Sequence, residues 1–189
     1  MRAQRAGESA LLLLDAIDAM KRANVRYAVV GAMAASIHGV VRASMDADAV
    51  LALPAHELAG LERQLRASGL ETELRYGDDD DPIAAVLALN DSFGNRVDLL
   101  VGLRGLDPAA FTRAFDVPFQ GESLRVVGRE DFIAMKLFAH GPQDTADAEF
   151  ALIAAGESLD VPLLERLAQR YGPETLAALR AMLAKRSSR

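Results

Sequence analysis

All strand-like segments of this chain precede a purely helical last part, and this order restricts the folds open to it. Every segment with the composition of a strand lies before residue 128, whereas everything from Arg129 onward has the pattern of helices separated by glycine and proline. The first part is expected to run helix, strand, helix, strand, helix and then paired strands. This order predicts an α+β fold with a mixed sheet, and not a regularly alternating parallel one.

The expected elements follow from side-chain periodicity and from the residues that interrupt it. We expect helices at residues 8–23, 32–38, 54–68, 131–139, 144–154, 161–171 and 173–185, and strands at residues 25–30, 46–53, 70–76, 83–89, 96–101, 117–119 and 124–127. Residues 90–95, rich in turn formers, predict a hairpin. The expected organisation is a core at residues 1–128 with a C-terminal helical region at residues 129–189 packed on it.

Composition excludes several classes of protein. With 189 residues, of which 51% are hydrophobic, the chain can bury a core and is not disordered. It has no cysteine, which rules out disulfides and thiolate metal sites. The net charge of −6 does not suit a protein that coats nucleic acid. The apolar run at residues 10–14 is too short for a membrane helix, so we expect no membrane association and a cytoplasmic location.

Two aspartates open the second expected strand. Asp46 and Asp48 are two residues apart, so in a strand their carboxylates project from the same face. Two like charges at the start of an otherwise apolar strand are costly unless a cation neutralises them, and oxygen ligands suit Mg²⁺ or Mn²⁺. The alternative is a solvated strand end.

A third aspartate lies in a strand whose neighbours are almost all apolar. Asp98 stands between Val97 and Leu99, and a buried carboxylate there needs a partner. If its strand lies beside the Asp46 strand, the three carboxylates form a site for two metal ions, which suits an in-line phosphoryl displacement. Alternatively, Asp98 pairs with an arginine such as Arg42 or Arg96.

Gly31 separates an expected strand from an expected helix. A glycine there permits a sharp turn and leaves the first helical N–H groups open to an anion such as phosphate. The alternative is an ordinary turn. His38 follows on an apolar helical face and is expected to pack or cap, and the four aspartates at residues 78–81 are expected to form a solvated turn.

Residues 29–48 resemble the signature of the nucleotidyltransferase superfamily, in particular the branch of abortive-infection-type toxins and small bacterial nucleotidyltransferase-like proteins. That signature has glycine at the head of a helix, then His-Gly, then Arg-x-Thr/Ser-x-Asp-x-Asp. The matching residues here are Gly31, His38, Gly39, Arg42, Ser44, Asp46 and Asp48, and Asp98 matches the third carboxylate.

A later helical motif of the family, a lysine followed by Asp-x-x-Asp, resembles Lys136 with Asp144 and Asp147. The sequence also departs from the family. Ala32 replaces a second Gly or Ser and so lacks a hydroxyl for phosphate, and the segment after Lys136 lacks the basic residue common in that branch.

The resemblance implies an α+β nucleotidyltransferase fold and the transfer of a nucleoside monophosphate from an NTP to a tRNA, protein or small-molecule acceptor. It assigns Mg²⁺ or Mn²⁺ to the three aspartates, with Asp98 also as the base, and makes Asp144 and Asp147 possible accessory residues. The implied nucleotide-binding residues are Gly31, Ala32, Met33, Arg42, Ser44 and Lys136, with Arg42 and Ser44 steadying the carboxylate strand.

Two alternatives belong to other functional classes. One is a catalytically inactive binding module that keeps the fold, which Ala32 favours. The other is a toxin–antitoxin component or regulator that acts through a cognate partner protein.

Overall fold

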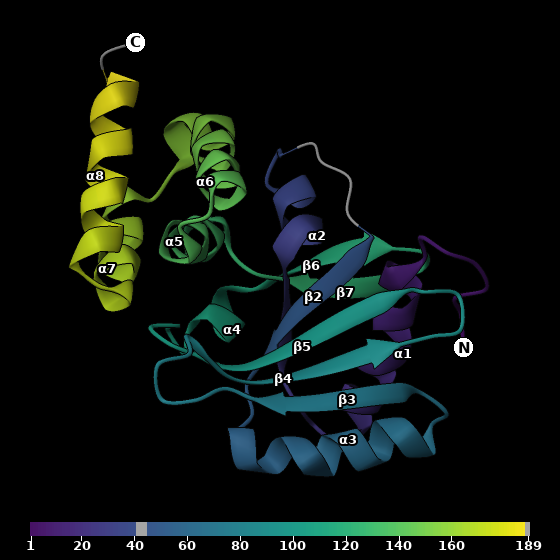
Figure 1. Cartoon of the computed structure of the whole chain (residues 1–189). Coiled ribbons are helices and arrows are strands. Elements are labelled where there is room, and N and C mark those ends of the chain that lie inside the picture. Colours follow the sequence, from purple (N-terminus) through teal and green to yellow (C-terminus); the bar gives the residue numbers. More distant parts are fainter. Residues whose placement is uncertain (41–44, 188–189) are drawn as a thin grey trace.

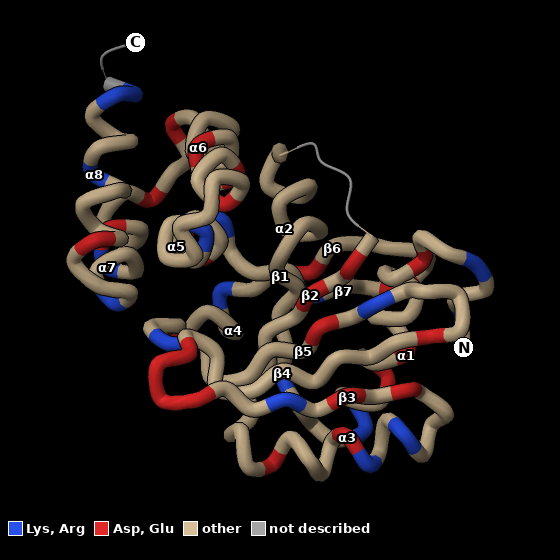
Figure 2. Tube along the Cα trace, viewed as in Figure 1, with Lys and Arg blue, Asp and Glu red and all other residues tan. Residues whose placement is uncertain are grey.

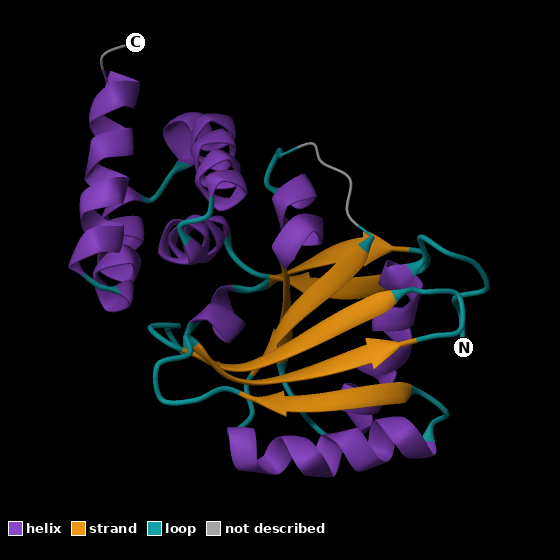
Figure 3. Ribbon diagram, viewed as in Figure 1, coloured by secondary structure: helices purple, strands orange, loops and turns teal. Residues whose placement is uncertain are grey.

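The computed structural model describes residues 1–40 and 45–187, and these form one seven-stranded mixed sheet flanked by helices (Figures 1 and 3). The predicted α+β architecture is therefore confirmed. In chain order the elements are α1 (Ser9–Arg22), β1 (Tyr27–Val30), α2 (Gly31–Ile37), β2 (Asp46–Leu51), η1 (Ala55–Glu57), α3 (Leu58–Ala67), β3 (Glu71–Tyr76), β4 (Ile83–Asn90), β5 (Arg96–Leu103), α4 (Ala110–Arg113), β6 (Phe115–Phe119), β7 (Glu122–Val126), α5 (Arg129–Ala139), α6 (Pro142–Ala155), η2 (Gly156–Ser158), α7 (Val161–Tyr171) and α8 (Pro173–Ser187).

The strand order across the sheet is β3-β4-β5-β2-β1-β7-β6. The hairpin of β4 and β5 is antiparallel, as is the β3–β4 pair. Strand β2 runs parallel to β5 and antiparallel to β1, while β1 pairs in parallel with β7. The centre of the sheet thus brings together strands that are about fifty residues apart in the sequence.

Alternating burial separates the two faces of the sheet. On β5, Val97, Leu99 and Val101 are buried, whereas Asp98 and Leu100 are only partly so. The buried face needs an apolar cover, and α1 and α3 supply it: α1 contacts β2 and β5, and α3 contacts β3 and β4. The fully buried side chains of these helices include Leu12, Leu13, Ile17, Leu58 and Leu65. The aspartate-bearing face is the opposite one.

The start of α1 ties together the beginnings of β2 and β5. Ser9 Oγ donates a hydrogen bond to the carbonyl of Met45 and accepts one from the backbone N–H of Arg96 at 3.0 Å. The buried side chain of Asn95 accepts from the N–H of Glu8 at 2.7 Å and donates to the carbonyl of Arg5 at 2.8 Å. These contacts hold the two strands in one register at the end where their charged residues lie.

Helices α5 to α8 lie together beside the sheet (Figure 1). Helix α5 contacts α6, α7 and α8, and its Phe132 and Ile133 are fully buried. The predicted division at residue 128 coincides with the start of α5 at Arg129, and its status as a boundary between units stays a prediction. Within the described residues, no helix is long and apolar enough to cross a membrane.

The structure differs from the expected elements in a few places. Helix α4 was not expected because a single turn of four residues gives no readable periodicity. Its Arg113 reaches the buried Asp131 of α5, with Nε–Oδ2 and Nη2–Oδ1 distances of 2.7 Å each. The predicted helix at residues 54–68 is divided into η1 and α3.

Candidate active site

Asp48 and Asp98 stand at the same level on neighbouring strands. Strands β2 and β5 are parallel, and their register pairs Asp48 with Asp98 and Asp46 with Arg96. Residues paired across a parallel ladder project from the same face, and neighbouring strands lie about 4.8 Å apart. Acidic segments of both strands accordingly lie side by side on the trace (Figure 2). The structure thus brings Asp48 and Asp98 together.

Asp98 carries a counter-ion from its own strand. Arg96 Nε lies 3.0 Å from Oδ1 and 3.2 Å from Oδ2 of Asp98. The pKa of the Arg96 guanidinium is raised, first by the hydrogen bond to Asp98, and the nearby charge of Asp46 contributes in the same direction. Arg96 is one of the two arginine partners considered from the sequence, and the other, Arg42, lies outside the described residues. Period-two spacing in a strand was the signal for the pair of Arg96 and Asp98.

The Asp48 carboxylate lies against Gly31. This glycine has φ +60° and begins α2 directly after β1, and an ideal Cβ placed on it would stand 1.9 Å from Asp48 Oδ2. Register explains the contact, because β1 pairs with β2 so that Val30 faces Asp48. The helix start and a carboxylate therefore share one small space.

A cavity of about 210 Å³ lies between the sheet and the helical region, beside Gly31 and Asp48. Gly31 at the start of α2 and Asp48 on β2 line it on one side, and Lys136 on α5 and Asp144 on α6 line it on the other. The apolar part of its wall on α5 includes Phe132, Met135 and Ala139. With Lys136 these residues follow the spacing i, i+3, i+4, i+7, which is one helix face. That spacing was the signal by which the sequence could have placed α5 on the cavity.

Lys136 is fixed by two carboxylates of α6. Its Nζ lies 2.6 Å from Asp144 Oδ1 and 3.1 Å from Asp147 Oδ2. Asp147 is fully buried and also accepts a hydrogen bond from Gln143 Nε2 at 2.9 Å. The three residues of the predicted helical motif are therefore one ion-paired cluster, with the lysine at the wall of the cavity that holds Asp48.

The remaining predicted site residues lie apart from that cavity or outside the described residues. Ala32, Met33 and Asp46 line a separate hollow of about 150 Å³, together with Ser36 and the start of α1. The structure thus divides the predicted nucleotide-binding turn between two cavities. Arg42 and Ser44 fall in the segment at residues 41–44, outside the described residues.

No known sequence family matches the chain, and no curated protein sequence matches it. Solved structures do. The crystal structure of ANT(2'')-Ia in complex with adenylyl-2''-tobramycin superposes with a TM-score of 0.58 at 14% identity, covering 85% of this chain and 97% of that one. The solution structure of the antibiotic-resistance factor ANT(2'')-Ia gives 0.54 at 17% identity, covering 94% of each chain. An antigenic nucleotidyltransferase-like protein from Paracoccidioides brasiliensis gives 0.54 at 16% identity, covering 98% and 92%. The chain has the nucleotidyltransferase fold.

The carboxylate oxygens of Asp48 and Asp98 are the type of ligand that hard divalent cations prefer. Asp48 and Asp98 offer carboxylate oxygens side by side, and Asp98 already binds a cationic group, the Arg96 guanidinium. Among residues 1–40 and 45–187, no three carboxylate or imidazole side chains form a group ready to hold a metal ion. Mg²⁺ is commonly bound through one or two carboxylates, waters and substrate phosphates, so two aspartates in register suffice as the protein's share.

His38 packs within the nucleotidyltransferase fold, as expected from the sequence. It is buried, its Nε2 lies 2.9 Å from the carbonyl oxygen of Val127, and its ring contacts those of Phe115 and Phe132 with centroids 5.9 Å and 5.2 Å away. Burial lowers the pKa of the imidazole. This histidine therefore connects α2 to the start of the helical region as a neutral side chain.

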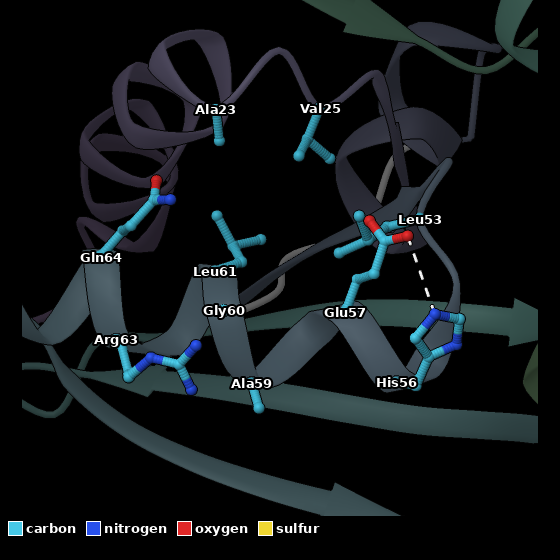
Figure 4. Close-up of a pocket in the computed structure, with 10 residues that line it drawn as sticks. All are labelled: Ala23, Val25, Leu53, His56, Glu57, Ala59, Gly60, Leu61, Arg63 and Gln64. Atoms are coloured by element: carbon cyan, nitrogen blue, oxygen red, sulfur yellow. Dashed lines mark ion pairs between the residues drawn. The ribbon is translucent and has the colours of Figure 1, made fainter.

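A larger hollow, of about 420 Å³, lies between the end of α1 and α3 (Figure 4). Its rim carries an exposed ion pair of His56 Nε2 with Glu57 Oε1 at 3.8 Å. It contains none of the residues predicted for the site, and α1 and α3 cover the sheet face opposite to the aspartates. The larger hollow is therefore not the candidate site.

Proposed function

We propose that this chain transfers a nucleoside monophosphate from an NTP to an acceptor, in a reaction that depends on Mg²⁺ or Mn²⁺. An acceptor oxygen attacks the α-phosphorus, the bond from that phosphorus to the β-phosphate oxygen breaks, and pyrophosphate leaves. The observation that carries the proposal is the pairing of Asp48 with Asp98 in register beside Gly31, on a fold that known nucleotidyltransferases share.

The carboxylates Asp46, Asp48 and Asp98 are the proposed metal ligands. A divalent cation held there would neutralise charge on the attacking and leaving oxygens. Asp98 would accept the proton of the acceptor hydroxyl, since it lies on the open face of the sheet and is partly exposed. Asp46, two residues before Asp48 on the same face, adds negative charge at the strand start.

The start of α2 is the proposed place for the phosphates. The first N–H groups of a helix have no acceptor within the helix, and they attract anions. In this chain the residues concerned are Gly31, Ala32 and Met33. Lys136 lines the same cavity as Gly31, which supports the proposal that its ammonium attracts the triphosphate. Asp144 and Asp147 would act as accessory residues by fixing that ammonium. Arg42 and Ser44 stay predictions as residues that steady the carboxylate strand.

We propose a small molecule as the first acceptor to test. The tobramycin in the ANT(2'')-Ia crystal structure is an adenylylated small molecule. A net charge of −6 also disfavours a long polyanionic acceptor such as tRNA. The cytoplasmic location and the partner-protein alternative stay predictions.

The test is incubation of the protein with each of the four NTPs, labelled at the α-phosphate, with Mg²⁺ or Mn²⁺. Acceptors would be supplied as a small-molecule filtrate of a cell extract, as tRNA and as the retained protein fraction. We expect label to move to the small-molecule fraction, with pyrophosphate released, and not to do so with Asp48→Asn or Asp98→Asn. Absence of transfer with every NTP, cation and fraction would reject the proposal.

A second candidate is a binding module that keeps the fold without catalysis. Two observations favour it: Ala32 lacks the hydroxyl expected at the turn, and Asp98 is already paired with Arg96. Calorimetry separates the two candidates from an unrelated role. A binding module binds an NTP without transferring label, whereas a protein with neither function does not bind NTP at millimolar concentration with either cation.

A further inference from the structure

Four charged side chains form a square on the open face of the sheet. Asp46 and Asp48 are two residues apart on β2, and Arg96 and Asp98 are two residues apart on β5. The register pairs Asp46 with Arg96 and Asp48 with Asp98. All four project from the same face. Three corners of this square are anionic, and one, Arg96, is cationic.

Arg96 uses its charge on the corner beside it. Its Nε contacts both oxygens of Asp98, at 3.0 Å and 3.2 Å, so the guanidinium covers the carboxylate end-on. The pair is accessible, with 36% of the Arg96 side chain and 22% of the Asp98 side chain exposed. An accessible pair of this kind contributes little to stability and can be exchanged at small cost. The effect of Arg96 on the binding of other cations to these carboxylates is therefore expected to be larger than its effect on stability.

We propose that Arg96 is an internal competitor for the divalent cation and sets the metal affinity of the site. The inference rests on the proposed function, because it assumes that Asp48 and Asp98 are metal ligands. The guanidinium occupies the side of the carboxylate that faces both oxygens, so a metal ion that binds on that side must displace Arg96. A metal ion that binds at the remaining lone pairs is repelled by the guanidinium charge. In both cases Arg96 opposes metal binding. Weak binding of metal alone follows, and the released guanidinium can then bind phosphate oxygens.

The chain offers a matched control. Arg75 on β3 pairs with Glu73 two residues earlier on the same strand, with Nε 3.6 Å from Oε1. The register places Glu73 opposite Ala88, and Ala88 opposite Asp98, so this second pair lies on the same sheet face two strands away. Arg75→Met removes one positive charge from that face without touching Asp98.

The test is a titration of the full-length protein with Mn²⁺ in the absence of nucleotide. Binding is measured by calorimetry and by the loss of the free Mn²⁺ signal in electron paramagnetic resonance. We expect Arg96→Met to bind Mn²⁺ about three- to tenfold more tightly than the unmodified protein. Arg96→Lys keeps the positive charge but replaces the planar guanidinium by a flexible, more strongly hydrated ammonium, so we expect an intermediate affinity. Arg75→Met should bind as the unmodified protein does.

The outcomes separate this inference from the function on which it rests. Equal or weaker binding by Arg96→Met, while the unmodified protein binds Mn²⁺, overturns the competitor role and leaves the metal site standing. If neither the unmodified protein nor Arg96→Met binds Mn²⁺ at millimolar concentration, the metal site and the inference are both overturned. If Arg96→Met does not show a cooperative thermal transition, Arg96→Lys carries the test with the same expected sign.

Discussion

The Asp48 carboxylate occupies the space in which a side chain at Gly31 would begin. Gly31 also has φ +60°, a conformation that side chains disfavour. The position is thus restricted to glycine twice, by the backbone and by the neighbour. Since that neighbour is a proposed metal ligand, a side chain at Gly31 would displace the carboxylate as well as strain the turn.

Gly31→Ala is expected to lower the free energy of unfolding by about 2–4 kcal/mol, through left-handed strain and collision with Asp48. Urea unfolding measures it. Gly94→Ala is the matched control, because Gly94 has φ +80° with nothing within 4 Å of its Cβ position, so it reports the strain alone. The double variant with Asp48→Ala should recover the collision part. Equal losses at the two glycines would show that the collision is unimportant.

Asp48→Asn is expected to abolish metal-dependent transfer while the metal-free protein melts at the same or a higher temperature. It removes one of the three negative charges that β2 and β5 carry on one sheet face, at almost constant volume. Thermal melts with and without Mg²⁺ measure this. A lower melting temperature of the metal-free variant would count against the catalytic assignment, and would indicate that Asp48 is chiefly a structural partner.

Lys136→Met should destabilise the protein by about 3 kcal/mol, because it leaves the fully buried Asp147 without its lysine. Combining it with Asp147→Asn should restore part of the loss. The control is Arg180→Met, which breaks an exposed ion pair with Glu165 at 3.1 Å and should cost less than about 0.5 kcal/mol. Similar effects of Lys136→Met and Arg180→Met on urea unfolding would be evidence against a structural cluster.

Ala32→Ser is expected to strengthen NTP binding about tenfold or more, since a hydrogen bond to a charged phosphate contributes about 1.5–3 kcal/mol. Ala32 borders a hollow of about 150 Å³, which leaves room for a hydroxyl. Ala34→Ser, on the same helix but fully buried, is the control and should not tighten binding. Calorimetry with Mg²⁺ and each NTP would decide, and unchanged affinity would show that the missing hydroxyl is not the limit.

Stability should fall as the pH drops below about 6.5, in part because of His38. Burial lowers the pKa of His38 in the folded state, so around that pH the unfolded chain binds the proton more readily. The penalty is absent well above pH 6.5 and grows as the pH falls toward the folded pKa. His38→Gln, which cannot titrate, should flatten the pH dependence of the melting temperature between pH 7 and 5. An unchanged slope would place the acid sensitivity elsewhere.

The mixed first part of the chain and its purely helical last part could be predicted, because local periodicity indicates most of their elements. The order of strands in the sheet could not, since pairing β2 with β5 depends on contacts about fifty residues apart. Helix α4 could not be predicted because a single turn shows no periodicity. It nevertheless carries Arg113, which forms an ion pair with the buried Asp131.

The candidate site was predictable to the same degree. Period two placed Asp46 and Asp48 on one face, and the fold brings Asp98 to them. Period two also placed Arg96 beside Asp98 on β5, but only the side-chain geometry shows that the two form an ion pair. The apolar wall contributed by Phe132 and Met135 followed a helical spacing, but only the docking of α5 against the sheet gives it a cavity to line.

The hydrogen bonds of Ser9 and Asn95 connect the beginning of α1 to the starts of β2 and β5, the strands that carry Asp48 and Asp98. Shortening the protein from its amino end by about ten residues would release the starts of β2 and β5 at once, although no proposed ligand would be removed. Crystallisation or labelling strategies that trim or rigidly fuse this end would therefore report on a weakened site. Attachments at the carboxyl end, beyond α8, avoid that hazard.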